Sequence, residues 1–198
     1  MALKNLQDLF LDELKDVYDA EHRITKALPK LIKEATSREL TTAFEKHLKQ
    51  TEEHITRLES VFEDIGESPT RKTCQAMVGL LKEGEELMEE EAPDSVKDAS
   101  LIAAAQKVEH YEMATYGCLR DWAQLLDYDD AAMLFQKTLD EEGEADKKLT
   151  QCAKSLNVEA VEGEDEEDDA EADRTVSPGR RMAGASSTAR TMDRPKGR

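Results

Sequence analysis

The chain has few aromatic, glycine and proline residues and no long apolar run. Aromatic residues make up 5% of its 198 residues, with one tryptophan, nine glycines and five prolines. This composition disfavours β-sandwiches and barrels, whose many strands and turns need such residues. No apolar run approaches the roughly 18 residues of a membrane-spanning helix, and the first ten residues lack the basic-then-apolar order of a secretory signal. We therefore expect a cytoplasmic protein that has no contact with a membrane.

Basic residues and cysteines are also scarce. Lysine and arginine number 27 against 45 acidic residues, which gives a formal charge of −18. Such a chain is a poor ligand for nucleic acid or an anionic lipid surface, because both attract basic proteins. The three cysteines are widely spaced and form no C-x-x-C pair. We expect neither a disulfide framework nor a zinc site, and we expect all three to be small buried residues.

Helical periodicity is the strongest positive signal in the sequence. Apolar residues recur every three or four positions in four long stretches, at about 2–35, 37–66, 96–126 and 130–156. Short breaks near residues 36 and 128 predict two antiparallel hairpins, and the long middle connection contains a short amphipathic helix at 73–90. Because that connection can return along the bundle, we predict an all-α, ferritin-like four-helix bundle of up-down, crossover, up-down topology.

The composition changes after the fourth helical stretch. We assign 1–157 to the bundle domain and predict that 158–198, acidic first and basic last, is a disordered tail. The tail is interpreted as a solvating extension, with a docking arm as the alternative.

Polar residues interrupt each apolar stripe where a core residue is expected. In so acidic a chain, one such residue carries little weight, but their depths agree. Glu21 and His54 are symmetric in sequence about the first turn, and Glu112 and Glu142 about the second. If the hairpins pair in register, all the interrupting residues lie in one layer: Glu21, Gln50, His54, Glu109, Glu112, Glu142 and Asp146.

A layer of buried carboxylates needs cations to balance its charge. No lysine or arginine interrupts the stripes, so we expect a pair of metal ions. Carboxylate oxygens with an imidazole favour iron, with manganese as the alternative. The di-iron bundle pattern combines a Glu from each of two helices with Glu-x-x-His from each of the other two, and this chain contains a variant of it.

Several long segments carry a resemblance to a known family. They are LKDVYDAEHRITKALPKL, HLKQTEEHITRLESVFEDIG, SLIAAAQKVEHYEMATYGCLR and TLDEEGEADKKLTQCA. Over residues 4–156 the chain resembles the YciE/YciF family of ferritin-like proteins. The resemblance implies a ferritin-like bundle, a homodimer, and a link to bacterial stress responses and ferroxidase activity.

The resemblance also implies roles for the interrupting residues. Glu21 and Glu109 take the places of the lone glutamates, and Glu112 adds a carboxylate one turn further on. Gln50 with His54, and Glu142 with Asp146, take the places of the two paired motifs. Gln50 departs from the family because relatives often have Glu there, and Asp146 departs because it replaces the second histidine. His47, one turn before Gln50, is a possible further ligand.

Three functions fit these observations. The leading hypothesis is a di-iron carboxylate protein that oxidises Fe(II) with O₂ or H₂O₂ in stress protection. The first alternative is a non-enzymatic, ferritin-like structural dimer in which the metal site is weak or lost, which the neutral Gln50 supports. The second alternative is peroxide disproportionation at a manganese pair, as in manganese catalases.

Overall fold

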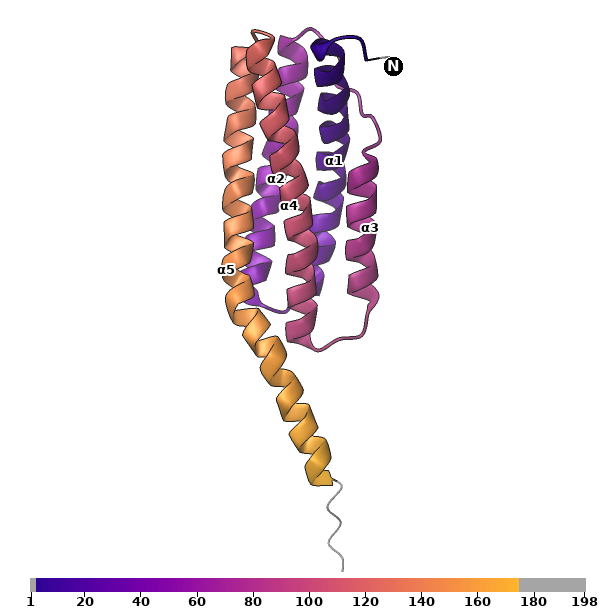
Figure 1. The fold of residues 1–198 in the computed structure, drawn as a ribbon, viewed down its shortest axis with the longest axis vertical. Coiled ribbons are helices and arrows are strands. Elements are labelled where there is room, and N and C mark those ends of the chain that lie inside the picture. The colour runs from indigo at the N-terminus through magenta and orange to yellow at the C-terminus, as the bar shows by residue number, and fades with distance from the viewer. Residues whose placement is uncertain (1–2, 175–198) are drawn as a thin grey trace, which may run out of the picture.

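A computed structural model describes residues 3–174 of the chain, and within this range it contains helices and no strand. None of these helices is long and apolar enough to cross a bilayer. Figure 1 shows the arrangement, with the elements α1 (Leu6–Glu34), α2 (Arg38–Asp64), α3 (Gln75–Glu89), α4 (Asp94–Leu125) and α5 (Asp129–Arg174).

The helix boundaries follow local capping signals. The side chain of Asn5 accepts a hydrogen bond from the Asp8 N–H at the start of α1. The side chain of Ser37 likewise accepts one from the Leu40 N–H at the start of α2. Between α4 and α5, Asp127 has a φ of 60°, a left-handed conformation that aspartate tolerates better than most residues. Both short turns therefore lie where the sequence predicts them.

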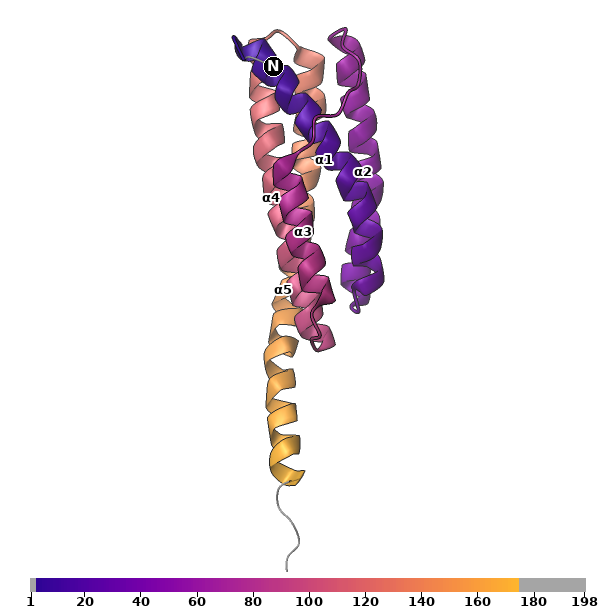
Figure 2. The ribbon, with the colours of Figure 1, turned by 90° about the vertical axis from the view of Figure 1, so that its right-hand side faces the viewer.

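The topology is the predicted one. α1 and α2 form one antiparallel hairpin, α4 and α5 form the other, and the connection between the hairpins returns along the length of the bundle (Figures 1 and 2). α3 lies within this connection and packs on α1 and α4. The expected all-α, ferritin-like bundle with a short extra helix in its crossover is confirmed.

A buried aspartate fastens the crossover to the bundle. Asp19 of α1 is 3% exposed and accepts a hydrogen bond of 2.9 Å from the backbone N–H of Cys74. The same carboxylate pairs with Arg23 and Arg71. These contacts hold the segment that precedes α3 against α1.

Two apolar clusters fill the bundle, one on each side of a polar layer. The first cluster is built from residues such as Ile24, Leu28, Phe44, Leu101 and Leu149. The second is built from residues such as Phe10, Leu14, Leu58, Tyr116 and Phe135. On α4 and α5, for example, the polar residues described below lie between the positions that join one cluster and those that join the other.

α5 extends beyond the bundle, and its last part is helical where the sequence predicts disorder after residue 157. The helix continues to Arg174, so residues 158–174 are helical, and Figure 1 shows this part projecting from the bundle. The segment is rich in glutamate and alanine, which are good helix formers, and it continues an existing helix without a new nucleation step. Residues 175–198 of the predicted tail lie outside the described residues. The domain boundary at 157 and the role of the tail stay predictions.

Candidate metal centre

Buried polar side chains from four helices meet in one layer of the bundle. α1 contributes one glutamate, α2 two histidines, α4 two glutamates and α5 one glutamate, and each is at most 5% exposed. These residues are Glu21, His47, His54, Glu109, Glu112 and Glu142. The layer lies between the two apolar clusters, which shield it from water at both ends.

The layer divides into two groups that share one residue. His47, Glu109, Glu112 and Glu142 form the first group, and Glu21, His54 and Glu142 form the second. Within each group, one ligand atom from every residue lies within 4.8 Å of the others. Glu142 therefore stands between two adjacent positions, each with a histidine of its own.

The histidine nitrogens point at carboxylate oxygens. His54 Nδ1 lies 2.9 Å from Glu142 Oε1 and 3.5 Å from Glu21 Oε1. His47 Nε2 lies 3.3 Å from Glu109 Oε1 and 3.8 Å from Glu142 Oε2. This convergence of imidazole nitrogen and carboxylate oxygen suits a divalent cation such as iron or manganese.

Many of these buried atoms have no hydrogen-bond partner of acceptable geometry. They are Glu21 Oε2, both ring nitrogens of His47, His54 Nδ1, Glu109 Oε2, and both oxygens of Glu112 and of Glu142. Buried polar atoms are almost always satisfied, because leaving them unpaired costs free energy. A metal pair would satisfy them together, so the residues present fit such a group.

Burial and mutual repulsion alter the proton affinities of the layer. Burial, with the charge of Glu142 added, raises the pKa of Glu109 and of Glu112 well above the ordinary value. Burial alone would lower the pKa of His54, but the adjacent carboxylates of Glu142 and Glu21 raise this pKa to about 10. Without a metal, protons thus balance part of the charge of the layer.

A set of polar residues surrounds the second group. His54 Nε2 lies 3.0 Å from Glu141 Oε2, and the Arg57 guanidinium holds that carboxylate with contacts of 2.6 and 3.1 Å. On the other side, the Tyr116 hydroxyl donates a hydrogen bond to Glu21 Oε1. Such outer partners orient metal ligands.

Five of the seven predicted site residues lie in the two groups, and two do not. Gln50 is partly exposed and lies at a surface cavity, because on α2 the inward face carries His47, Thr51 and His54 at spacings of four and three. Asp146 instead accepts a hydrogen bond of 2.9 Å from Gln106 and lies 3.3 Å from His110.

The sequence reasoning left out part of the site. His47 was only a possible ligand, although its spacing of seven residues from His54 places both on one helix face. Glu141 and Arg57 were not singled out. In a chain with so many charged residues, only the three-dimensional arrangement separates this pair from ordinary surface ions.

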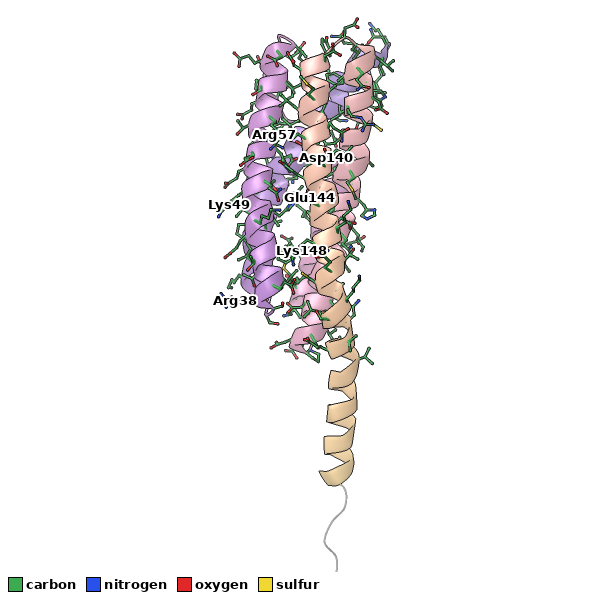
Figure 3. The ribbon with its side chains drawn as sticks, turned by 90° about the vertical axis from the view of Figure 1, so that its left-hand side faces the viewer. Arg38, Lys49, Arg57, Asp140, Glu144 and Lys148 are labelled. Atoms are coloured by element: carbon green, nitrogen blue, oxygen red, sulfur yellow. The ribbon has the colours of Figure 1, made fainter. Side chains whose placement is uncertain are left out.

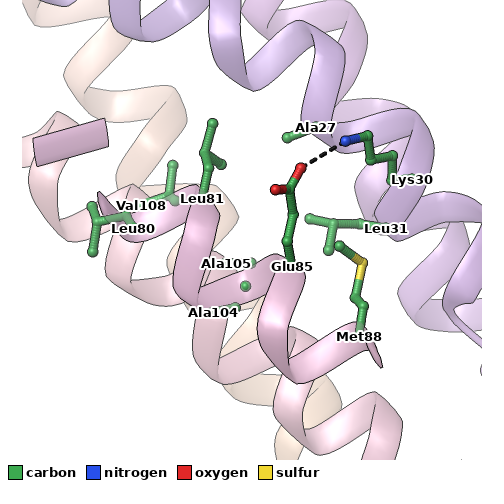
Figure 4. A pocket seen from close by; sticks show the side chains of 11 residues that line it. Ala27, Lys30, Leu31, Leu80, Leu81, Glu85, Met88, Ala104, Ala105 and Val108 are labelled. Carbon is green, nitrogen blue, oxygen red and sulfur yellow. Dashed lines mark hydrogen bonds and ion pairs between the residues drawn. The ribbon is translucent and has the colours of Figure 1, made fainter. Parts of the chain in front are cut away.

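Two small cavities lie near the bundle core, and one reaches the polar layer. The first lies among α1, α3 and α4, and the Lys30–Glu85 ion pair of 2.7 Å lies at its edge (Figure 4). Apart from that pair its lining is apolar, and it contains no residue of the layer. The second lies between α2 and α5, and its lining includes His47 and Glu109.

Comparison with known proteins identifies a family and similar proteins. A family model described as a domain of unknown function, DUF892, matches residues 5–162. The chain is 43% identical over 154 residues to Protein YciF of Escherichia coli strain K12, which covers 77% of this chain and 93% of the relative.

Solved structures agree with this likeness. The crystal structure of the E. coli stress protein YciF matches with a TM-score of 0.76 and 42% identity, over 78% of this chain and 98% of that one. YcfI from Rhodopseudomonas palustris matches with a TM-score of 0.73 and 44% identity, over 74% and 94%. A two-domain protein from Anabaena variabilis with a ferritin-like domain matches at 0.52 and 16% identity, over 92% and 42%, which supports the fold alone.

Proposed function

We propose that this chain, which belongs to the DUF892 family and has a ferritin-like fold, binds two iron ions and oxidises Fe(II) with O₂ or H₂O₂. The observation that carries the proposal is the pair of buried His/Glu groups joined by Glu142. Two adjacent ions can transfer two electrons together, which avoids the release of one-electron oxygen species.

The residues of this chain have separable tasks in that reaction. Glu142 lies between the two groups and can contact both ions, while His47 and His54 each supply a neutral nitrogen ligand. The four glutamates balance the charge of the ions, and the apolar clusters keep bulk water out. With peroxide as the oxidant, two Fe(II) give up one electron each, and H₂O₂ with two protons becomes two waters.

The setting of the reaction is part of the same proposal. One relative is described as a stress protein, which supports protection against iron and peroxide as the role. We place the chain in the cytoplasm as a homodimer, and light scattering on the purified protein tests the homodimer.

A structural role is the second candidate function. The description of YcfI from Rhodopseudomonas palustris as a candidate structural protein favours it. In that case the bundle would keep its fold while the layer binds metal weakly.

Metal content per chain decides between these functions. The protein is expressed with iron or with manganese supplied, next to a Glu21→Ala/Glu109→Ala double variant, and measured by elemental mass spectrometry. About two irons per parent chain, and almost none in the variant, support the iron reaction. Manganese in place of iron supports peroxide disproportionation. No metal in either protein, with both equally helical, supports the structural role.

A further inference from the structure

The two halves of the polar layer differ in their access to solvent. Glu21 and His54 are 0% exposed, and Tyr116 on one side and the Glu141–Arg57 pair on the other cover them. His47 is 5% exposed and Glu109 is 2% exposed. The group that contains His47 is therefore the half closer to solvent.

A cavity leads from the surface to that half. It lies between α2 and α5, has a volume of about 40 Å³, and has room for one or a few water-sized molecules. Ala43 of α2 and Ala145 of α5 are among its lining residues, and both are partly exposed. His47 lines it too, is nine-tenths buried, and has no hydrogen-bond partner for either ring nitrogen. An unsatisfied ligand nitrogen thus borders an opening large enough for a small reactant.

The rim of the cavity is not acidic, in contrast to the chain as a whole. Its polar lining on the solvent side consists of Lys46, Gln50, Glu144 and Lys148. Figure 3 shows Glu144 and Lys148 on α5, on the side of the bundle where α2 and α5 are neighbours. Two lysines and one glutamate do not concentrate cations, and the amide of Gln50 is neutral. Lys148 also pairs with Glu39, so the charges at the rim cancel and set no strong electrostatic barrier to a small molecule or an ion.

The geometry points to this cavity as the entrance to the metal centre: ions and small oxidants reach the His47 group through it, and this group exchanges its ion faster than the sealed Glu21–His54 group. Gln50 is then a residue of the entrance. This inference rests on the proposed two-metal centre. It adds the order in which the two ion positions fill and the path by which ions reach them.

Cobalt(II) is the probe, because its visible absorption reports ligation by carboxylates and imidazoles. Stopped-flow mixing of the full metal-free chain with cobalt is expected to show two phases of uptake. Release of bound cobalt to a chelator is also expected to show two phases. Ala145→Phe narrows the cavity from α5, and Ala43→Phe narrows it from α2. Each is expected to slow the fast phase of uptake and of release by the same factor, roughly tenfold, with unchanged equilibrium affinity and stoichiometry.

Two further variants control the experiment. Ala103→Phe places the same side chain at an exposed position of α4 that does not line this cavity, and it is expected to leave both phases unchanged. His47→Ala is expected to remove the fast phase and keep the slow one, which tests the order of filling even if a narrowed variant fails to fold.

Each result has a definite meaning. Unchanged rates in Ala145→Phe and Ala43→Phe, or loss of the slow phase in His47→Ala, overturn the entrance while leaving a two-metal centre in place. A parent chain that binds no cobalt overturns the centre and the entrance together. Equal slowing of uptake and release, confined to the two narrowed variants, supports the route.

Discussion

At the scale of single residues, His54 has carboxylate neighbours on both sides of its ring. One ring nitrogen faces Glu21 and Glu142, and the other faces Glu141. Because the neighbouring carboxylates raise its pKa to about 10, the ring is protonated at neutral pH in the metal-free chain. In a metal-loaded chain, His54 would bind the ion through Nδ1, while Glu141 would hold the proton on Nε2 and the orientation of the ring.

Replacing Glu141 therefore tests its positioning role. We expect Glu141→Gln to weaken metal binding by roughly 10- to 100-fold, the usual cost of losing such an outer partner, with the bundle intact. The matched control is Glu53→Gln, since the Glu53 carboxylate also pairs with Arg57, at 3.2 Å, but is exposed and makes no ion pair with the His54 ring. Competition with a coloured chelator measures both affinities. Equal losses in the two variants would contradict the role of Glu141.

The three cysteines differ in exposure, which corrects one expectation. Cys74 and Cys152 are buried as predicted, but Cys118 lies on the outer face of α4 and is exposed. Burial raises the pKa of the Cys74 and Cys152 thiols, which lowers their thiolate fraction at neutral pH. We expect one fast-reacting thiol per native chain with a chromogenic disulfide reagent, and three after unfolding. Cys118→Ser should remove the fast reaction, and a persisting fast reaction would refute the assignment.

At the scale of elements, the turn between α1 and α2 depends on a residue from the other hairpin. The Asp98 carboxylate of α4 is 1% exposed and accepts hydrogen bonds of 2.8–2.9 Å from the Thr36 N–H, the Thr36 hydroxyl and the Ser37 N–H. These contacts hold the turn that precedes α2 and join the two hairpins at one end of the bundle.

We expect Asp98→Ala to be among the most destabilising single changes outside the apolar clusters. It leaves three donors without a partner and removes charge-assisted hydrogen bonds, a loss of about 2–4 kcal/mol in the free energy of unfolding. Asp121→Ala, an exposed acid on the same helix that pairs with its neighbour Arg120, should change stability by no more than about 0.5 kcal/mol. Urea unfolding followed by circular dichroism compares them, and similar losses would show that Asp98 is not a special contact.

Elements were easier to predict from the sequence than contacts between them. Apolar periodicity and the cap at Ser37 locate the long helices and the first turn, because both signals are local. The matched depths of Glu21, His54 and Glu142 also identify the layer. The role of Asp98 was not predictable in this way, because it depends on how one hairpin packs against the other. The inward direction of His47 rather than Gln50 depends on the exact rotation of α2.

At the scale of the whole molecule, the polar layer divides the core in two. Apolar clusters on either side stabilise the bundle, while the four glutamates between them destabilise the metal-free chain through burial and repulsion. Such a layer is retained at a cost in stability, as is common for functional sites. If the layer binds metal as proposed, binding should couple strongly to folding, because the unfolded chain has no such assembled site.

The effect of replacing Glu112 on the free energy of unfolding should change sign when metal is added. Both of its oxygens lack partners, so Glu112→Met removes a poorly satisfied buried acid and fills a similar volume. In chelator we expect the variant to exceed the parent by about 1–3 kcal/mol in the free energy of unfolding. With free metal at 1,000 times the dissociation constant, the parent gains about 4.1 kcal/mol per site. The variant, with a damaged first group, should gain less and become the less stable of the two.

Urea unfolding with and without manganese(II) measures this crossing. Glu45→Gln, at an exposed position of α2, should have the same free energy of unfolding as the parent with and without metal, because Glu45 belongs to neither group. A Glu112→Met variant that is less stable than the parent even in chelator would show that Glu112 contributes to the fold itself. Parallel gains in parent and variant would show that metal binds elsewhere. Only a reversal confined to Glu112→Met fits a layer whose instability is offset by the ions it binds.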